Sequence, residues 1–350
     1  VRDWKFGDRT WREFREEHGE TAHHDKAGSN NFAIAGPLSA HGGSIVANDM
    51  HLGHRLPNIW YRARMSWPEG SGRRALVGVS LPGTPALVVG SNGQVAWGFT
   101  NTMGDWADLV VLEFESSRST RYRTPEGWRE LEREPERIEV AGSTPDTLWV
   151  EKTIWGPVWD TDADGRRRAL RWTAHDAEAV NLELIRMETA ANVDEVLSIA
   201  GRLGIPAQNL VCGDSAGRIA WVLAGRIPRR EGWDGRTSVS WADGGHAWTG
   251  YVNPRENPRV VDPPHGHLWT ANNPVATGPD LRLIGDGGYA LGARAAQIRG
   301  GLEGLPARAS ERDLLSIALD DRALMLERWR ELALETLAKA PSDSPVSYTH

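Results

Sequence analysis

The segment Gly28-Ser29-Asn30-Asn31-Phe32-Ala33-Ile34-Ala35 marks the point at which this 350-residue chain changes character. Residues 1–28 mix acidic and basic side chains and hold too few apolar residues to form a packed domain. After Ser29, apolar runs alternate with Gly, Pro and Asn, as in a globular fold. We therefore expect residues 1–28 to be a linker and residues 29–350 to form the folded part, which opens with a strand.

Beyond this segment, the same alternation of apolar runs and turns predicts more strands. The Ser91-Asn92-Gly93 sequence between two apolar runs is a strong hairpin signal. The predicted strands cover residues 44–47, 87–89, 94–98, 108–112, 209–212 and 218–224, with several more between 120 and 175. Helical spacing occurs at 179–203 and 310–339, where Ser310 and Asp313 are placed as a capping pair. Sheets with segregated helices indicate an α+β layered fold.

The composition argues against some classes of partner. The net charge is −7 and no basic stretch stands out, which argues against nucleic acid. No apolar run approaches the roughly 20 residues of a membrane span, so we expect no membrane partner. Cys212 is the single cysteine and cannot form an internal disulfide. The 17 Trp residues predict aromatic cores in β-rich regions or the lining of a substrate cleft.

Two short motifs suggest other chemistries. Residues 213–217 (GDSAG) fit the G-x-S-x-G pattern, in which the serine, here Ser215, must stand between a strand and a helix. An apolar run that looks like a strand follows, so we predict a hairpin turn instead. Zinc needs three or four ligands at defined spacing, and the His-rich groups match no such motif. These groups are Asp49, His51 and His54, and separately His265 and His267. We expect His54 and His267 to be exposed loop residues.

Ser29 offers a third chemistry. It follows a small residue and opens a strand at the boundary between linker and globular part. A cut before Ser29 would give this one residue a hydroxyl and a free α-amino group, a group whose ordinary pKa is about 7.7–8.0. The amine could take the hydroxyl proton and return it to a leaving amine, directly or through one water. Ser29 would then supply both nucleophile and base.

A series of motifs after Ser29 resembles the penicillin acylase family of N-terminal-nucleophile (Ntn) hydrolases, in the family's own order. They are GSNNF at 28–32, ANDMHLG at 47–53, PNIWY at 57–61, NGQVAWGFTN at 92–101, DWAD at 105–108, QNLV at 208–211, GRIP at 225–228, TANNP at 270–274 and AR at 293–294. The resemblance runs from residue 29 to about 339. It implies a four-layer αββα sandwich, in which two antiparallel sheets lie between helical layers.

The resemblance also implies a reaction at Ser29. The chain would cut itself between Gly28 and Ser29, and the exposed Ser29 would then hydrolyse a linear acyl amide, such as the side-chain amide of a β-lactam. The side-chain amide of Asn272 and the backbone N–H of Asn101 would form the oxyanion hole. The family needs no organic cofactor.

Two further residues receive supporting roles from the resemblance. His51 stands beside the nucleophile in the family pattern and would orient Ser29 and the leaving group. Arg294 would hold Asn272 and keep the surroundings positive, which favours the neutral amine of Ser29.

Calcium, a partner chain and an exported location are also implied by the resemblance. Asp105 and Asp108, with the carbonyls of Ala107 and Pro228, match positions that bind calcium in some relatives, and oxygen ligands suit that ion. Asp286 aligns poorly with a further ligand. Because the chain opens with Val1 rather than Met, we expect a fragment that lacks most of its α chain, with 1–28 as the tail or spacer. Residues 345–350 do not resemble the family. Relatives are exported, so we expect a periplasmic or extracellular location.

Three alternative functions stay open at this stage. The first is an N-acyl-homoserine-lactone acylase with the same machinery and a deep apolar pocket for the acyl chain. The second is an uncleaved, non-catalytic relative that binds ligands in a Trp-lined cleft. The third is an ordinary serine hydrolase that uses Ser215.

Overall fold

The structure is a computed structural model that describes residues 5–6, 9–10, 28–53, 56–70 and 72–339. Most of the predicted linker, His54 and residues 345–350 lie outside the described residues. Within the linker, β1 (Lys5–Phe6) pairs with β2 (Arg9–Thr10). The division at residue 28 therefore stays a prediction.

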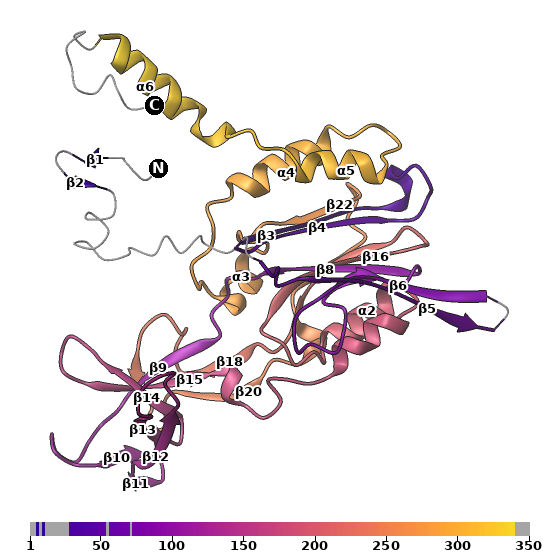
Figure 1. The fold of residues 1–350 in the computed structure, drawn as a ribbon. Helices are drawn as coiled ribbons and strands as arrows, with labels where there is room; N and C mark the ends of the chain where they lie inside the picture. The colour runs from indigo at the N-terminus through magenta and orange to yellow at the C-terminus, as the bar shows by residue number, and fades with distance from the viewer. Residues whose placement is uncertain (1–4, 7–8, 11–27, 54–55, 71, 340–350) are drawn as a thin grey trace.

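Two antiparallel sheets face each other in the centre of the molecule (Figure 1). The smaller sheet has the order β22-β3-β4, with β22 at His267–Thr270, β3 at Gly28–Ile34 and β4 at Ile45–His51. The larger sheet has the order β21-β17-β16-β8-β7-β6-β5. Its strands are β5 (Tyr61–Glu69), β6 (Gly72–Ser80), β7 (Val89–Ser91), β8 (Val95–Asn101), β16 (Gln208–Asp214), β17 (Ile219–Ala224) and β21 (Arg259–Val261). Strand β3 contacts β8 and β16 across the gap between the sheets.

Helices cover the outer face of each sheet (Figure 1). Helices α4 (Ala293–Glu303) and α5 (Glu311–Ala318) pack on the smaller sheet, and α2 (Val193–Ala200) packs on the larger one. The order helix, sheet, sheet, helix confirms the predicted αββα fold. The remaining helices are α3 (Gly278–Ile284) and α6 (Glu327–Lys339), with 3₁₀ turns η1 (Gly36–Leu38), η2 (Thr173–His175), η3 (Glu183–Thr189), η4 (Pro254–Glu256) and η5 (Leu324–Leu326).

The strand predictions agree with the structure better than the helix predictions. The capping pair of Ser310 and Asp313 is present and begins α5. The helix predicted at 179–203 is too long, because its first half forms the 3₁₀ turn η3 and only α2 is α-helical. The predicted helix at 310–339 is likewise divided, since α5 ends at Ala318 and α6 begins at Glu327. Among the described residues, no helix is long and apolar enough to cross a membrane.

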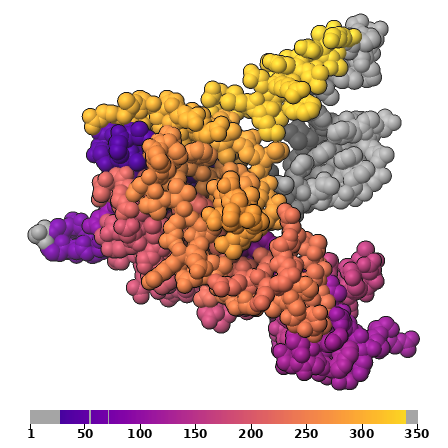
Figure 2. All heavy atoms as spheres, turned by 180° about the vertical axis from the view of Figure 1, so that it is seen from behind, coloured from indigo at the N-terminus to yellow at the C-terminus, as the bar shows by residue number. Residues whose placement is uncertain are grey.

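A second, smaller β-rich lobe follows β8, and Figure 2 shows it from behind. Its six-stranded sheet has the order β12-β13-β14-β15-β9-β19, flanked by the hairpins β10-β11 and β18-β20. The strands are β9 (Ala107–Val111), β10 (Arg121–Thr124), β11 (Gly127–Glu130), β12 (Glu132–Ile138), β13 (Asp146–Thr153), β14 (Gly156–Thr161), β15 (Arg167–Trp172), β18 (Pro228–Glu231), β19 (Val239–Ser240) and β20 (Ala247–Tyr251). Trp155, Trp233 and Trp241 pack edge to face in its core, so these Trp residues serve a β-rich core.

The side chains of β3 alternate between two environments. Phe32 and Ile34 point to the face covered by α4 and α5, where they join the core beneath these helices. Ala33 points the other way, into the apolar layer between the two sheets. Because successive side chains of a strand point to opposite faces, Ser29 shares the inner face with Ala33, whereas Gly28 and Asn30 share the helix face with Phe32. This alternation positions the site described next.

Candidate active site

Ser29 lies near the start of β3, where it pairs with Met50 of β4. The residue is 8 % exposed, so its hydroxyl is largely shielded from bulk water. It borders a cavity of about 440 Å³ between the sheets. The lining is mostly apolar and comes from Met50, Leu52, Trp60, Leu81, Val88, Val89, Phe99, Leu184, Ile205 and Pro206, with polar groups from Thr84, Asn101 and Gln208. A serine hydroxyl at the edge of an apolar cavity suits attack on a substrate with an apolar acyl group.

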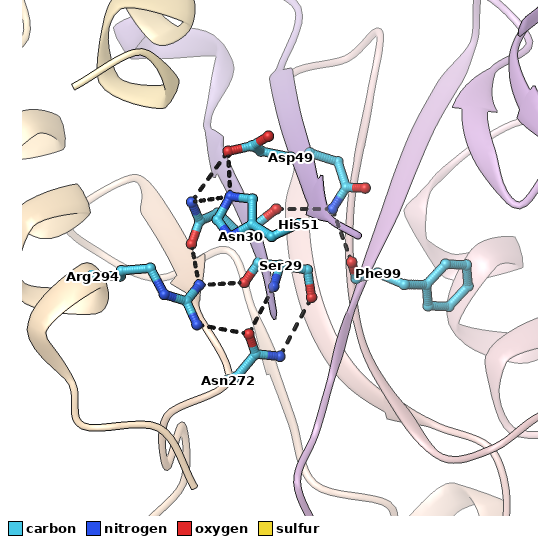
Figure 3. Close-up of polar contacts among 8 residues, drawn as sticks. Ser29, Asn30, Asp49, His51, Phe99, Asn272 and Arg294 are labelled. Carbon is cyan, nitrogen blue, oxygen red and sulfur yellow. Dashed lines mark hydrogen bonds and ion pairs between the residues drawn. The ribbon is translucent and has the colours of Figure 1, made fainter. Parts of the chain in front are cut away.

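Asn272 contacts Ser29 and Arg294 (Figure 3), and it also contacts Asn101. Its Oδ1 accepts a hydrogen bond from the Ser29 N–H at 2.8 Å, and its Nδ2 lies 3.4 Å from the Ser29 hydroxyl. The same Nδ2 donates to the Asn101 carbonyl at 2.9 Å. Asn272 is fully buried and has a φ of 62°, a left-handed conformation that Asn tolerates better than most residues. The amide is therefore held in one orientation, with its nitrogen toward the hydroxyl.

Arg294 fixes this orientation from the first turn of α4. Its Nη2 donates to Asn272 Oδ1 at 2.9 Å, and its Nη1 donates to the Ser29 carbonyl at 2.9 Å and to Asn30 Oδ1 at 2.6 Å. Burial lowers the pKa of Arg294, which Asp49 partly offsets, yet a guanidinium stays protonated at any working pH. The predicted contact between Arg294 and Asn272 is present, and it places a positive charge beside Ser29.

His51 lies elsewhere than its predicted role requires. In the register of β3 and β4 it pairs with Gly28, so its ring is on the helix face and not on the face of the Ser29 hydroxyl. His51 Nε2 contacts Asp49 Oδ2 at 2.7 Å, and Asn30 Nδ2 lies 3.3 Å from the same nitrogen. His51 thus meets the residue before the predicted cut, and a direct contact with the Ser29 hydroxyl is not part of this arrangement.

A model of the family described as penicillin amidase matches residues 2–347 of this chain. The chain belongs to the penicillin amidase family. The match covers nearly the whole sequence. Membership of this family therefore explains the order of motifs, the fold and the cluster around Ser29.

Individual relatives agree with this assignment. The chain is 29% identical to an acyl-homoserine lactone acylase, QuiP, of Pseudomonas aeruginosa over 71% of this chain and 30% of that protein. It is 31% identical to the penicillin acylase 2 proenzyme of Pseudomonas sp. strain SE83 over 71% of this chain and 32% of that protein. The thermostable penicillin G acylase of Alcaligenes faecalis superposes with a TM-score of 0.72 at 24% identity, over 90% of this chain and 56% of that one. This penicillin amidase family member spans about a third of the length of the two curated relatives.

The residues predicted to hold calcium surround an arginine. Arg230 of β18 donates to Asp108 Oδ2 at 2.8 Å and lies 3.2 Å from Asp105 Oδ2. Trp248 Nε1 donates to the same oxygen of Asp108 at 2.6 Å. Burial raises the pKa of Asp105 to about 6, with a further rise from Asp108 and Asp286, while Arg230 opposes the shift. Asp286 is therefore close enough to Asp105 to raise its pKa, although Asp286 aligns poorly with a calcium ligand of the family.

This arrangement does not fit a calcium ion. Calcium takes six to eight oxygen ligands, whereas both carboxylates here already face a guanidinium. Within the residues that the structure describes, no group of three His, Cys, Asp or Glu side chains could hold a metal ion. Calcium binding by Asp105, Ala107, Asp108 and Pro228 stays a prediction from the resemblance.

The G-x-S-x-G motif and the pair of His265 and His267 have structural explanations. Ser215 lies in the turn between β16 and β17, so the G-x-S-x-G sequence is a hairpin, as predicted, and not a nucleophile elbow. His265 and His267 stack on each other at 5.0 Å near Trp269, and His267 is not the exposed loop residue that was predicted, because it begins strand β22 and is partly buried. They supply two ligand atoms, and zinc sites take three or four.

Sequence reasoning did not assign a role to Asn30 or Asp49. Asn30 is 8 % exposed and bridges Arg294 to Asp49, because its Oδ1 accepts from the arginine and its Nδ2 lies 3.4 Å from the carboxylate. The two residues are direct partners in the register of β3 and β4. Working out that register from the two predicted strands would have found the pair.

Proposed function

We propose that this chain is the nucleophile-bearing part of an amide hydrolase that cuts itself after Gly28 and then uses Ser29. The observation that carries the proposal is the buried cluster in which Asn272 contacts both the nitrogen and the hydroxyl of Ser29. A cut would turn this nitrogen into an α-amine next to its own hydroxyl. The Arg294 guanidinium, which donates to the Ser29 carbonyl, favours the neutral form of that amine.

In the proposed reaction, the Ser29 hydroxyl attacks the substrate carbonyl while the α-amine takes its proton. The negative charge on the carbonyl oxygen is stabilised by Asn272 Nδ2 and the backbone N–H of Asn101. One hydrogen of Nδ2 is used by the Asn101 carbonyl, and the other points toward the Ser29 hydroxyl. The intermediate then expels the amine with the returned proton, and water releases the acid from the acyl-enzyme.

The apolar cavity beside Ser29 is the proposed site of the acyl group. Its walls include the aromatic residues Trp60 and Phe99 and the aliphatic residues Met50, Val88 and Leu184. Side chains of this kind favour burial of an aliphatic or aryl acyl chain, at about 25 cal/mol for each Å² removed from water. A β-lactam side-chain amide and an N-acyl homoserine lactone both satisfy this requirement.

The second candidate, hydrolysis of N-acyl homoserine lactones, is supported by the aliphatic majority of this lining. A relative of P. aeruginosa is named for that activity. Release of a long-chain fatty acid faster than phenylacetate, from amides of the same amine, would favour this candidate. Faster release of phenylacetate would favour a penicillin-acylase preference.

The partner chain and the location belong to the same proposal. A cut after Gly28 would divide the protein into an α chain and a β chain that stay associated, and one relative is named a proenzyme. Export to the periplasm or the cell exterior is proposed from the resemblance. Fractionation of cells that express the complete gene would test it, and an active enzyme confined to the cytoplasm would contradict it.

The decisive experiment uses the complete gene. The wild-type protein should yield a large fragment whose first residue is Ser29, and S29A should be neither cut nor active. S215A should retain both properties, because Ser215 lies in a hairpin turn. Turnover by a protein whose Gly28–Ser29 bond remains intact would overturn the proposal and favour an uncleaved, non-Ntn mechanism.

A further inference from the structure

The helix face of β3 carries polar groups that the reaction at Ser29 does not use. Gly28 and Asn30 lie on this face, opposite His51 and Asp49 of β4. The Ser29 side chain lies on the other face by strand alternation, and Gly28 and Ser29 both border the apolar cavity. The peptide bond to be cut therefore has the nucleophile on one side and a histidine–carboxylate pair on the other.

The hydrogen bonds around His51 fix which ring nitrogen carries the proton. Nε2 lies 2.7 Å from Asp49 Oδ2, and an ionised carboxylate accepts hydrogen bonds only, so Nε2 must be the donor. Asn30 Nδ2 is also a donor and cannot bond to a protonated Nε2, so it is left to the Asp49 carboxylate at 3.4 Å. Arg294 holds Asn30 in this orientation through its Oδ1. In the neutral ring, Nδ1 is then an unprotonated base.

This free nitrogen faces Gly28. A Cβ placed on Gly28 would lie 3.4 Å from His51 Nδ1, 3.2 Å from Arg294 Nη2 and 3.5 Å from Asn272 Oδ1. Three polar groups therefore surround the one residue whose carbonyl must be attacked during cleavage. A base and a cation beside the residue that carries an ester carbonyl are groups that its hydrolysis can use.

We propose that His51 is the general base for the water that completes chain cleavage, and that Asp49 is the residue that positions it. The inference rests on the proposed function, in which the Ser29 hydroxyl first attacks the Gly28 carbonyl carbon. In that first step the C–N bond breaks, the hydroxyl proton passes to the nitrogen, and an ester joins Gly28 to Ser29 Oγ.

Water then attacks this ester from the side of His51. His51 Nδ1 takes one proton of the water, and the hydroxide adds to the Gly28 carbonyl carbon. The C–Oγ bond breaks, and Oγ takes the proton of the imidazolium through solvent, which returns His51 to its neutral form. The Gly28 carboxyl group then ionises by passing its proton to the neutral Ser29 amine. Asp49 keeps the proton of the resting ring on Nε2 and stabilises the imidazolium while it exists.

The test uses hydroxylamine, which attacks esters without the help of a base. In the complete protein, D49N and H51A should cut after Gly28 about a hundredfold more slowly than the wild type, since one general base contributes roughly 10²–10⁴. Hydroxylamine at neutral pH should restore cutting in both variants and leave a hydroxamate on Gly28, identified by mass. S29A should stay uncut with hydroxylamine, because it cannot form the ester.

A matched control exists in the same fold. His41 Nε2 lies 3.1 Å from Glu311 Oε1 and forms a second, solvent-exposed histidine–carboxylate pair. E311Q should cut at the wild-type rate. Wild-type cutting rates in D49N and H51A would overturn the inference, and so would slow variants that hydroxylamine does not rescue, since these would lack the ester. A wild-type protein that is never cut would instead overturn the proposed function.

Discussion

Two partly buried arginines of this protein are surrounded by different partners. Arg230 faces the carboxylates of Asp105 and Asp108, so its charge is balanced by two acids. Arg294 donates to three oxygens among the described residues, and all three belong to uncharged groups of Ser29, Asn30 and Asn272. The first arginine joins β18 to the segment that leads into β9. The second has no direct ion pair among the described residues, although Asp49 raises its pKa, and it places a positive charge beside Ser29, the proposed nucleophile.

The largest expected effect is the loss of activity when the positive charge beside Ser29 is removed. R294M should lower kcat/KM by about 10²–10³, because Asn272 loses the partner that orients its amide as an oxyanion donor. The free energy of unfolding should change little. R299M is the control, since Arg299 lies on the same helix and pairs with Glu303 at the surface. Equal losses of kcat/KM in R294M and R299M would mean that the position of Arg294 beside Ser29 has no special importance.

Replacement of Arg230 should have the opposite effect, with a loss of stability and little loss of activity. R230M should lower the free energy of unfolding by about 3 kcal/mol, because it leaves two carboxylates near each other without a cation. Activity per folded molecule should stay near the wild-type value. R229M, which breaks only an exposed contact of 3.6 Å with Glu256, should cost less than about 1 kcal/mol in chemical denaturation.

Adding Ca²⁺ to the stability measurement tests whether Arg230 and calcium compete for the same carboxylates. With Arg230 in place, added Ca²⁺ should leave the Tm of the wild type unchanged, whereas R230M should regain part of its lost Tm. A rise in the wild-type Tm that D108N abolishes would show that calcium can take the place of the guanidinium.

A smaller effect is expected when Arg294 is replaced by Lys, which keeps the positive charge but lacks the planar guanidinium. Lys cannot bond to Ser29, Asn30 and Asn272 at once, since it presents a point charge instead of a planar fork. R294K should therefore lower kcat by about tenfold, which is less than R294M, with KM nearly unchanged. If R294K were as damaged as R294M, orientation alone would explain the role of Arg294 and its charge would not matter.

The smallest effect concerns pH and Asp105. Its pKa is raised by burial from 3.8 to about 6, so the fold favours the protonated acid. This contribution to stability is complete below about pH 4 and is lost as the pH rises through about 6. D105N cannot ionise, so its Tm relative to the wild type should rise by a few degrees between about pH 4 and pH 7. A difference in Tm that stays constant with pH would mean that Arg230 balances the charge completely.

Much of the sheet structure could be predicted from the sequence because it depends on local patterns. The apolar run after Ser29 became β3, and the Asn92-Gly93 turn joins β7 to β8. The spacing of Leu182, Leu184 and Ile185 looked helical, but this segment forms the 3₁₀ turn η3. Hydrophobic spacing alone does not separate one helical turn type from another over so few residues.

The candidate site was predictable only in part, because its members are joined by tertiary contacts. The motifs around Asn272 and Arg294 pointed to their contact only through the family resemblance. Asp49 and Asn30 are polar residues of ordinary appearance, and their meeting depends on strand register. His51 was predicted to orient Ser29 and the leaving group, and the register places it beside Gly28. A one-residue difference in a strand reverses the face of a side chain.

The bond expected to break lies inside an ordinary strand. Gly28 and Ser29 both pair with β4, and Asn31 pairs with β22 on the other side. Cutting between the first two residues would leave the remainder of β3 held by both neighbours. In the proposed mechanism, the fold would therefore be complete before the cut, and activation would need a change of bonding rather than a change of shape.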